Sequence, residues 1–489
     1  MLSGIALAVV FSLGYVATTA AWNLFRHPLH YIPGPRLWIA FPLLRYLSEA
    51  RGRIDADLRQ FHLRYGEAVR FAPGEVSFIT AQAWKDINGH GRKQMPKARH
   101  TGGEPTDIIG ANDADHTRFR KSLSHAFSAK GLQAQEPILM GYVDQLIAGL
   151  REESQSEDPV DMVKWYNLTT FDLIGDLAFG ESFGGLKARE YHPWVATVFR
   201  SVQVLGLLKL QDSYPLLFHV LSWFIPKSLI DARRRQLEYS QETVEKRLRR
   251  GRDRGPADFM DSMLRHHGGR DGLTEEELGA NASILVTAGS ETTASLLSGV
   301  TFWLLQSPEV LAQVTQEVRT AMQSETDITF ESVTTRLPFL LACIEEGFRT
   351  YPPVPSGFQR VTQTATCISG YSVPSGTKVA VHQSSAYRSP LNFHHADRFI
   401  PERWLPEARE NPDSPFYHDR RDVLQPFSIG PRNCIGRNLA HNEMRLILAR
   451  VLWNFDLALC QESRGWADQR SFIIWQKPPL LCRLTARAL

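Results

Sequence analysis

The chain has 489 residues, of which 43% are hydrophobic and 22% are charged, and its formal net charge is only +3. This length allows a large hydrophobic core, and the small net charge argues against nucleic acid as a partner. The five cysteines are scattered and form no Cys-x-x-Cys pair, so we expect neither a disulfide framework nor a zinc site.

Residues 1–25 contain no charged side chain. As a helix they would extend about 37 Å, which is enough to cross a bilayer core of about 30 Å. A cleaved signal peptide is the alternative, with Ala17–Ala20 as a small-residue cleavage site. No lysine or arginine precedes the apolar run, whereas Arg26, Arg36 and Arg45 follow it. This asymmetry favours an uncleaved, single-pass transmembrane anchor with the body of the protein in the cytosol.

A short elbow joins this anchor to the remainder of the chain. Pro33, Gly34 and Pro35 form a stiff, non-helical segment. We assign residues 26–36 to a proline-rich hinge. Residues 37–489 form a single domain, because no internal linker, repeat or low-complexity tract follows.

The hydrophobic periodicity predicts a mainly α fold with a minor β-sheet. Two segments predict strands, namely 68–80, which turns at Pro73-Gly74, and 366–383. Most of the rest predicts helices, at 115–127, 136–152, 160–179, 229–250, 274–306, 308–323, 337–350 and 437–457.

The apolar stretch Ser213–Pro226 is too short to cross a bilayer, and proline interrupts it near both ends. Two interpretations stay open. The stretch forms either a monotopic patch that dips into the membrane beside the anchor or a buried pair of helices.

The predicted helix 274–306 would run about 50 Å, which suits a helix that crosses the middle of a large globule. It opens with a capping box at Thr274–Glu277. Its apolar second part carries one charge, Glu291, next to Thr292. A carboxylate in such surroundings needs a polar partner or a function.

The stretch Phe427–Ala440, FSIGPRNCIGRNLA, places a single cysteine, Cys434, between two glycines. No local Cys-His pattern supplies the base that a cysteine nucleophile needs, so a metal-binding thiolate is the better interpretation. Gly430 and Gly436 permit tight turns around the sulfur, and the N-terminus of the following helix would lower the pKa of the thiol. Arg432 would point at an anion beside the metal.

This stretch resembles the haem-binding signature of the cytochrome P450 monooxygenases. It matches the pattern F-S-x-G-x-R-x-C-x-G at Phe427, Ser428, Gly430, Arg432, Cys434 and Gly436. The resemblance implies that Cys434 is the axial thiolate ligand of a haem b iron. It also implies that Phe427, Arg432 and Gly436 belong to the cofactor site.

Two further stretches resemble the family in the same chain order. EGFR supplies Glu346 and Arg349, and PERW supplies Arg403. Glutamate and arginine three residues apart are common on helices and worth little at a surface. The resemblance implies that these three residues form a buried network that braces the haem core, so we assign them to folding rather than to chemistry.

The stretch AGSETT, Ala288–Thr293, resembles the oxygen-binding motif of the family. Gly289 would let a ligand approach the helix backbone closely. Glu291 and Thr292 would act as a catalytic acid and hydroxyl that deliver protons to bound dioxygen. The alternative is a helix interior in which the threonines only hydrogen-bond to backbone carbonyls.

Three basic residues resemble the family's contacts to the haem propionates. His116 and Arg120 match a W-x-x-x-R helix in which histidine replaces tryptophan, and Arg360 fits a third contact. An imidazole can still donate a hydrogen bond. The alternative for Arg360 is a surface arginine.

The resemblance extends from the proline hinge to Leu489 and implies the cytochrome P450 fold, with 37–489 as the haem-thiolate catalytic domain. The chain is most similar to fungal microsomal members that tailor secondary metabolites. Such an enzyme inserts one oxygen atom from dioxygen into a hydrophobic natural-product intermediate, by hydroxylation, epoxidation or oxidative ring formation. The alternatives are a haem-thiolate isomerase or dehydratase that uses no dioxygen, and a non-catalytic haem sensor.

The chain has no flavin or nicotinamide motif of its own. The resemblance therefore implies an NADPH–cytochrome P450 reductase as partner, with cytochrome b5 as a further one, at the endoplasmic reticulum membrane. Arg437 and Arg445 could meet the acidic surface of the reductase. By analogy with the family, the substrate pocket is expected to be lined by the largely apolar segments 97–114, 200–226, 286–293 and 354–358.

Overall fold

The computed structural model describes residues 2–91, 93–98, 106–199, 210–250, 258–265, 269 and 272–488. Helices account for 58% of the structure and strands for 9%, which confirms the predicted mainly α fold. The labelled helices are α1 (Leu2–Phe25), α2 (Arg36–Ala40), α3 (Leu43–Ala50), α4 (Ile54–Tyr65), α5 (Ala81–Asn88), α6 (Asp113–Leu123), α7 (Ala129–Glu153), α8 (Met162–Phe179), α9 (Gly185–Ala188), α11 (Leu210–Ser213), α12 (Pro215–Ser222), α13 (Lys227–Arg250), α14 (Phe259–Leu264), α15 (Glu275–Leu305), α16 (Pro308–Ala321), α17 (Phe330–Thr335), α18 (Pro338–Thr350), α19 (Gln383–Tyr387), α20 (Pro406–Glu410) and α21 (Arg437–Asn454).

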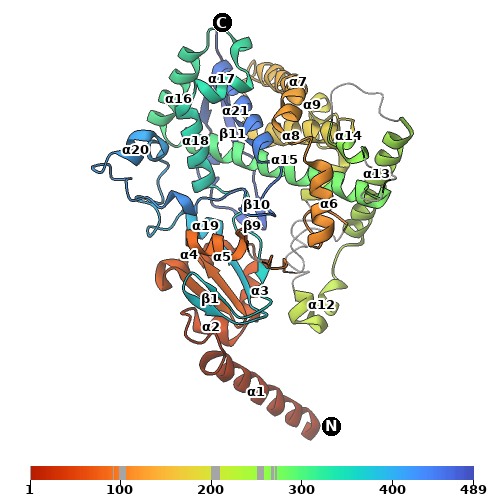
Figure 1. Cartoon of the computed structure of the whole chain (residues 1–489), viewed down its shortest axis with the longest axis vertical. Helices are drawn as coiled ribbons and strands as arrows, with labels where there is room; N and C mark the ends of the chain where they lie inside the picture. The colour runs from red at the N-terminus through yellow and green to blue at the C-terminus, as the bar shows by residue number, and fades with distance from the viewer. Residues whose placement is uncertain are drawn as a thin grey trace.

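The strands form small sheets, and the sheet that contains β1 lies at the end of the body beside α1 (Figure 1). The largest has the order β1-β2-β7-β4 and consists of β1 (Ala68–Ala72), β2 (Glu75–Phe78), β7 (Lys378–Val381) and β4 (Arg360–Val361). Within it β2 and β7 are parallel, and the other neighbours are antiparallel. The smaller sheets pair β3 (Val160–Asp161) and β8 (Phe455–Leu459) with β11 (Leu481–Ala486), β5 (Thr366–Ile368) with β6 (Tyr371–Val373), and β9 (Arg470–Phe472) with β10 (Ile474–Gln476).

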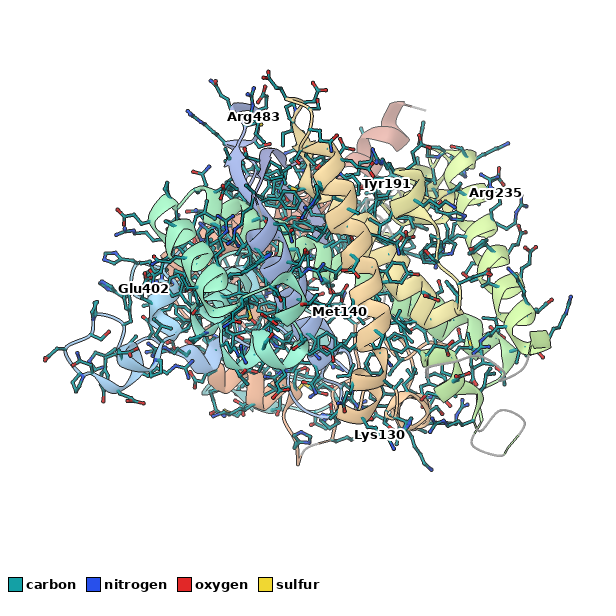
Figure 2. The ribbon with its side chains drawn as sticks, turned by 90° about the horizontal axis from the view of Figure 1, so that it is seen from above. Lys130, Met140, Tyr191, Arg235, Glu402 and Arg483 are labelled. Atoms are coloured by element: carbon teal, nitrogen blue, oxygen red, sulfur yellow. The ribbon has the colours of Figure 1, made fainter. Side chains whose placement is uncertain are left out.

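Helix α15 crosses the middle of the body, and most of its residues are buried in the core (Figure 1). The predicted capping box is present, since Thr274 accepts a hydrogen bond from the Glu277 N–H and Glu277 accepts one from the Thr274 N–H. The helix packs against α8, α13, α18 and α21. Seen from above, side chains fill the space between the helices, with α7 running past Lys130 and Met140 (Figure 2). The apolar character of α15 therefore reflects its burial inside the protein.

Two predicted helices are shorter than expected because the chain enters a sheet. The helix predicted to reach Leu457 ends at Asn454, where β8 begins and pairs with β11. The helix predicted from Val160 begins at Met162, because residues 160–161 pair with β11 first. Asp161 then caps α8 by accepting a hydrogen bond from the Val163 N–H at 3.0 Å.

Helix α1 projects from one end of the body, beside the sheet that contains β1 (Figure 1). Its large apolar side chains are exposed, for example Phe11 at 70% and Phe25 at 69%. Within the part of the chain that the structure describes, no helix combines the length and the apolar character that a membrane crossing requires. The transmembrane role of α1 stays a prediction.

The elbow after α1 is packed against the sheet. Arg70 of β1 is buried, and its guanidinium Nη1 donates to the carbonyl of Asn23 in the last turn of α1 at 2.9 Å. The Arg70 N–H donates to the Pro33 carbonyl at 2.9 Å. A Cβ at Gly34 would lie 1.8 Å from the Arg70 carbonyl oxygen, so the chain passes the sheet in direct contact. The segment predicted as a hinge is therefore a fixed joint, in which a cation also faces the negative end of a helix dipole.

Helix α12, within the apolar stretch whose role the sequence left open, has no buried residue. Leu216 is 84% exposed, and Trp223 and Phe224, which follow the helix, are 73% and 77% exposed. The structure therefore excludes the interpretation as a buried helix pair. It leaves an apolar surface at the same end of the body as α1 (Figure 1).

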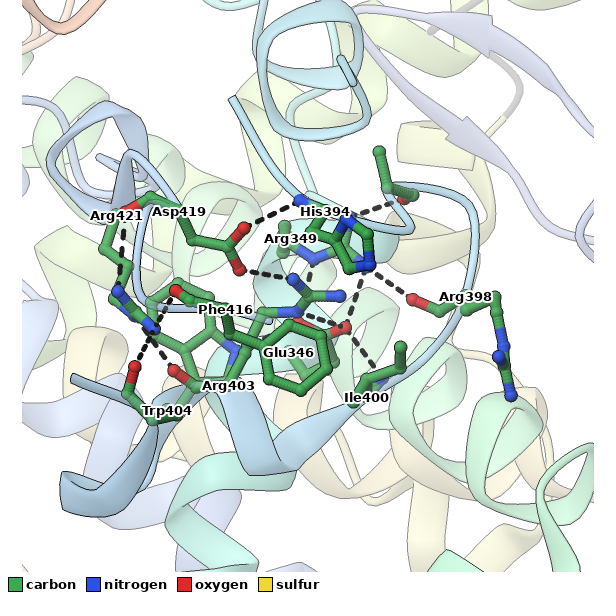
Figure 3. Close-up of polar contacts among 12 residues, drawn as sticks. Glu346, Arg349, His394, Arg398, Ile400, Arg403, Trp404, Phe416, Asp419 and Arg421 are labelled. Carbon is green, nitrogen blue, oxygen red and sulfur yellow. Dashed lines mark hydrogen bonds and ion pairs between the residues drawn. The ribbon is translucent and has the colours of Figure 1, made fainter. Parts of the chain in front are cut away.

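The predicted buried network of Glu346, Arg349 and Arg403 is present (Figure 3). The Glu346 carboxylate accepts hydrogen bonds from Arg349 at 2.7 and 2.8 Å and from Arg403 at 3.2 Å. It also accepts from the indole of Trp404 at 2.9 Å. Arg403 forms a second ion pair with Asp419, which the sequence did not indicate. The two arginine side chains are fully buried, so each charge relies on these partners.

We expect Asp419→Ala to lower the free energy of unfolding by about 3–5 kcal/mol, because it leaves the Arg403 charge buried with one partner fewer. The matched control is Asp397→Ala, which removes the ion pairs that Arg59 and Arg388 form with an aspartate that is 67% exposed. Because this aspartate is exposed, the loss should be about 1 kcal/mol or less. Urea unfolding followed by tryptophan fluorescence measures both, and equal losses would contradict the assigned role of Asp419.

Candidate active site

The loop before α21 holds Cys434 in a backbone conformation that depends on Gly430. Gly430 has φ +80°, and a Cβ there would lie 1.7 Å from the carbonyl oxygen of Asn88 at the end of α5. The loop is closed by a hydrogen bond from the Cys434 N–H to the Phe427 carbonyl at 2.9 Å. The turn predicted at Gly430 is therefore confirmed, and its cause is both the left-handed backbone and the contact with α5.

Gly436 serves a different purpose from the predicted tight turn. It precedes α21 with an ordinary φ of −82°. A Cβ there would lie 3.9 Å from Cys434 Sγ. Burial raises the pKa of the Cys434 thiol, although the Gly436 N–H, Arg120 and Arg437 oppose this shift. The start of the following helix does lower this pKa as predicted, through the Gly436 N–H, but desolvation of the thiol outweighs it and the net shift is upward.

Cys434 lines a cavity between α15, α21 and α6. The volume of this cavity is about 260 Å³. Opposite the loop, the wall is formed by Ala288, Gly289, Thr292 and Thr293 of α15. Both threonine hydroxyls donate to backbone carbonyls four residues earlier, Thr292 to Ala288 at 2.6 Å and Thr293 to Gly289 at 2.9 Å. Residues 200–226 were predicted to line the substrate pocket. Residues 200–209 lie outside the described residues, and none of residues 210–226 lines the cavity.

One edge of the cavity gathers basic side chains from separate parts of the chain. They are Lys97, His116, Arg120, Arg360 and Arg432. Their hydrogen bonds go mainly to neutral protein oxygens: Lys97 donates to the Ile109 carbonyl at 2.7 Å and Arg120 to the Asn433 carbonyl at 2.7 Å. Arg432 also pairs with the exposed carboxylate of Asp113 at 2.7 Å. The edge therefore carries more positive than negative charge.

Burial and mutual repulsion lower the pKa values of Lys97 and His116 on this edge. Burial, followed by the charges of Arg360 and Arg432, lowers the pKa of Lys97 to about 7. Burial, followed by Arg432, Arg120 and Lys97, lowers the pKa of His116 to about 4. Arg360 Nε is buried without a hydrogen-bond partner among the described residues. The edge is thus built for an anionic group that enters the cavity.

The sequence matches the profile of the cytochrome P450 family over residues 32–483. The chain belongs to the cytochrome P450 family. It is 57% identical to the cytochrome P450 monooxygenase olcB of Penicillium canescens, over 100% of this chain and 99% of that protein. It is 54% identical to the trichothecene C-4 hydroxylase of Trichoderma arundinaceum, over 99% of this chain and 98% of that protein. The averantin hydroxylase of Dothistroma septosporum is 40% identical, over 96% and 90%.

This P450 chain is a haem-thiolate monooxygenase of the kind that fungi use in secondary metabolism. The cavity fits the haem: the Cys434 thiol lies at its wall for the iron, and the basic edge matches two propionates. Of the sequence-predicted cofactor residues, all line this one cavity: Cys434, Arg432, Phe427, Gly436, His116, Arg120 and Arg360. Arg360 is 4% exposed, which excludes the alternative of a surface arginine.

The predicted catalytic pair is divided by the structure. Thr292 lines the cavity, whereas Glu291 does not. The Glu291 carboxylate is buried and forms an ion pair with Lys477, which also donates to Ser295 Oγ at 2.7 Å. Thr292 and Thr293 therefore lie at the cavity wall, whereas the Glu291 side chain turns toward Lys477.

Sequence reasoning expected Lys97 only within the pocket-lining segment 97–114, and it missed Glu443 altogether. No motif marks Lys97 as part of the basic edge, and only the return of its segment to β4 brings it beside Arg360. Glu443 lies two turns into α21 and lines the cavity. The sequence signal for Glu443 was present, since a glutamate occupies a helix whose other neighbours are largely buried, but helical amphipathicity alone did not separate it from a surface acid.

We expect the retention of haem to depend on pH through the charge of Lys97. In the haem-free site its pKa is about 7, and an adjacent propionate must raise it, so affinity is full below about pH 7 and falls as pH rises above that value. Haem transfer from the enzyme to apomyoglobin should therefore accelerate above about pH 7, by at most about tenfold per pH unit. Lys97→Met should lose this dependence, whereas the exposed Lys93→Met should keep it. An unchanged dependence in Lys97→Met would contradict the contact.

Proposed function

We propose that this P450 hydroxylates a carbon atom of an apolar, polycyclic natural-product intermediate. The observation that carries the proposal is the apolar wall opposite Cys434, formed by Ile174, Ile284, Leu285, Val354 and Phe358. Such a wall favours a substrate by burial of apolar surface and offers little charge for a polar one. Two of the relatives are named for hydroxylation, of a trichothecene and of averantin. Epoxidation and oxidative ring formation are the other outcomes of the same chemistry.

The bound haem supplies the activation of dioxygen. The protein holds the cofactor by its basic edge and by the thiol of Cys434. It places the substrate against α15, whose Gly289 lies at the cavity wall and faces the side chain of Ile174. Thr292 contributes a hydroxyl at this wall. The loop around Cys434 and α15 thus fix the cofactor and the substrate from opposite sides.

Electrons come from NADPH through a partner reductase. We infer that the partner is the membrane-bound NADPH–cytochrome P450 reductase, with cytochrome b5 as a second donor. Arg437 is exposed at the start of α21, three residues after Cys434, and Arg445 lies further along the same helix. Basic side chains in this position favour association with an acidic partner surface.

We further propose that residues 1–25 anchor the protein in the endoplasmic reticulum membrane as a single pass, with the catalytic domain in the cytosol. The support is the uncharged sequence of α1, its exposed apolar side chains and the apolar surface of α12 at the same end of the body. Leu37 and Phe41, beside the joint, are 67% and 43% exposed. A surface of this kind lies in the membrane interface beside an anchor.

We expect deletion of residues 1–25 to convert a carbonate-resistant membrane protein into one that carbonate extracts. The truncated protein should still float with vesicles at neutral pH, because the surface at Trp223 and Phe224 remains. Adding Trp223→Ser and Phe224→Ser to the deletion should abolish flotation. Extraction of the full-length protein by carbonate would contradict the anchor, and haem-free aggregation of the truncated protein would place the segment in the core.

The proposed reaction is tested by reconstitution with the reductase and NADPH in microsomes, using isotope-labelled dioxygen and a panel of apolar polycyclic substrates that includes a trichothecene. We expect one labelled oxygen atom per product and none in the Cys434→Ser variant. That variant should also lose the red-shifted Soret band of the ferrous carbon monoxide complex. Product formation without NADPH would contradict the monooxygenase reaction and favour the isomerase.

A further inference from the structure

The loop 106–112, which leads into α6, belongs to no helix or strand and lies at the cavity. Two of its residues, Ile108 and Ile109, line the cavity. The buried side chain of Asp107 folds the loop, since its Oδ1 accepts hydrogen bonds from the N–H groups of Ile109 at 2.7 Å and Gly110 at 2.8 Å. These bonds lie within the loop, so its position at the cavity depends on contacts with other parts of the chain.

The side-chain amide of Asn281 fixes this loop to the central helix α15. Asn281 is 0% exposed, and its Oδ1 accepts a hydrogen bond from the Ile108 N–H at 3.0 Å. Its Nδ2 donates to the Thr106 carbonyl at 3.2 Å and to the Glu277 carbonyl, one turn earlier in α15, at 2.8 Å. Asn281 itself does not line the cavity. A buried amide is unfavourable unless it is hydrogen-bonded, and here two of the three bonds go to the backbone of the loop.

The opposite side of the loop is held by the basic edge of the cavity. Lys97 donates to the Ile109 carbonyl at 2.7 Å, and Arg432 donates to the Ala111 carbonyl at 2.8 Å. The loop is therefore attached on two sides, to the residues that serve the cofactor and to α15. Loss of the Asn281 bonds would release the attachment to α15 and leave the attachment to the basic edge in place.

We propose that Asn281 is a positioning residue for substrate specificity, which fixes Ile108 and Ile109 at the wall that a large apolar substrate contacts. This inference rests on the proposed hydroxylation of an apolar substrate and assigns a residue that orients it. A loop that is ordered before binding spares the ligand the free energy of ordering it. Without the Asn281 attachment, large ligands should bind more weakly and in altered orientations, whereas small ligands of the haem iron should bind as before.

The first test measures ligand binding to the full-length, haem-loaded enzyme and needs no turnover. The probes are two nitrogen ligands of haem iron, imidazole, which is small, and clotrimazole, which is bulky and apolar. Asn281→Leu removes the hydrogen bonds with a side chain of similar shape. The Kd of clotrimazole should rise about tenfold, whereas that of imidazole should change by less than about twofold. Asn281→Ala removes the same bonds with a smaller side chain and should give the same contrast.

Asn167→Leu is the matched control. Asn167 is a second buried amide, 2% exposed, but it lies on α8, donates to Tyr191 and does not line the cavity. This variant should leave both Kd values unchanged, and the carbon monoxide Soret band verifies that each variant is folded around haem. An unchanged Kd of clotrimazole in both Asn281 variants, or an equal loss of affinity in Asn167→Leu, would overturn the proposal.

A double-mutant cycle tests whether Asn281 acts through the loop. The effects of Asn281→Leu and Ile108→Ala on the Kd of clotrimazole should be less than additive, because the first change already displaces the side chain that the second removes. Full additivity would contradict this route.

In turnover with the reductase and NADPH, Asn281→Leu should change the ratio of hydroxylated regioisomers and raise KM more than it lowers kcat. A wild-type ratio would overturn the role in orienting the substrate. If the wild type hydroxylates no apolar substrate, the proposed reaction fails, and the comparison of clotrimazole with imidazole still decides whether Asn281 fixes the loop.

Discussion

The Glu346 carboxylate is the interaction on which the haem side of the body depends. It is fully buried and accepts hydrogen bonds from two arginines, one indole and the backbone N–H of Ile400. Because a buried carboxylate is unfavourable without such partners, α18 and the segment at Ile400–Trp404 can only fold together. That segment continues through Asp419 to the loop of Cys434. The position of the thiol is therefore set by a charge network that takes no part in the chemistry.

The two sides of the catalytic cavity also differ in charge. On the basic edge, Lys97 and Arg360 face each other with too few anions, and this repulsion is relieved only when an anionic cofactor enters. Behind the α15 wall, the Glu291 carboxylate forms an ion pair with Lys477 inside the protein. Binding of an anionic cofactor therefore gains free energy from the relief of the repulsion between Lys97 and Arg360, which is present in the cofactor-free protein.

Helix α15 shows how one helix can serve several functions. It crosses the core, yet it carries Glu291 toward Lys477 on one face and Thr292 and Thr293 toward the cavity on another. Because an α-helix has 3.6 residues per turn, the side chains along α15 are distributed around the helix and contact different parts of the protein. The acid that contacts Thr293 comes from α21, whose N-terminus begins at the thiol loop. The loop that holds the cofactor and the wall that faces its other side are therefore joined through a single helix.

The sequence by itself determined the helical class, the central helix with its capping box, the strand pair that turns at Pro73-Gly74, and the identity of Cys434. These features are local: they follow from periodicity, from turn residues and from side chains a few positions apart. The buried network was also predictable in its three main members, because their motifs stand in a recognisable order. Asp419 escaped detection, since an aspartate in a polar loop gives no sign of the arginine that it will meet.

Only the tertiary structure decided which acid faces the cavity, that Lys97 joins the basic edge, and that α12 is exposed. Each of these depends on contacts between residues far apart in the chain: Glu291 with Lys477, Glu443 with Thr293, and Lys97 with Arg360. A sequence pattern gives the period of a helix but not the neighbour toward which each face turns. The burial and the pairing of a charge are set by that neighbour, which is why the different surroundings of Glu291 and Glu443 become visible only in the folded protein.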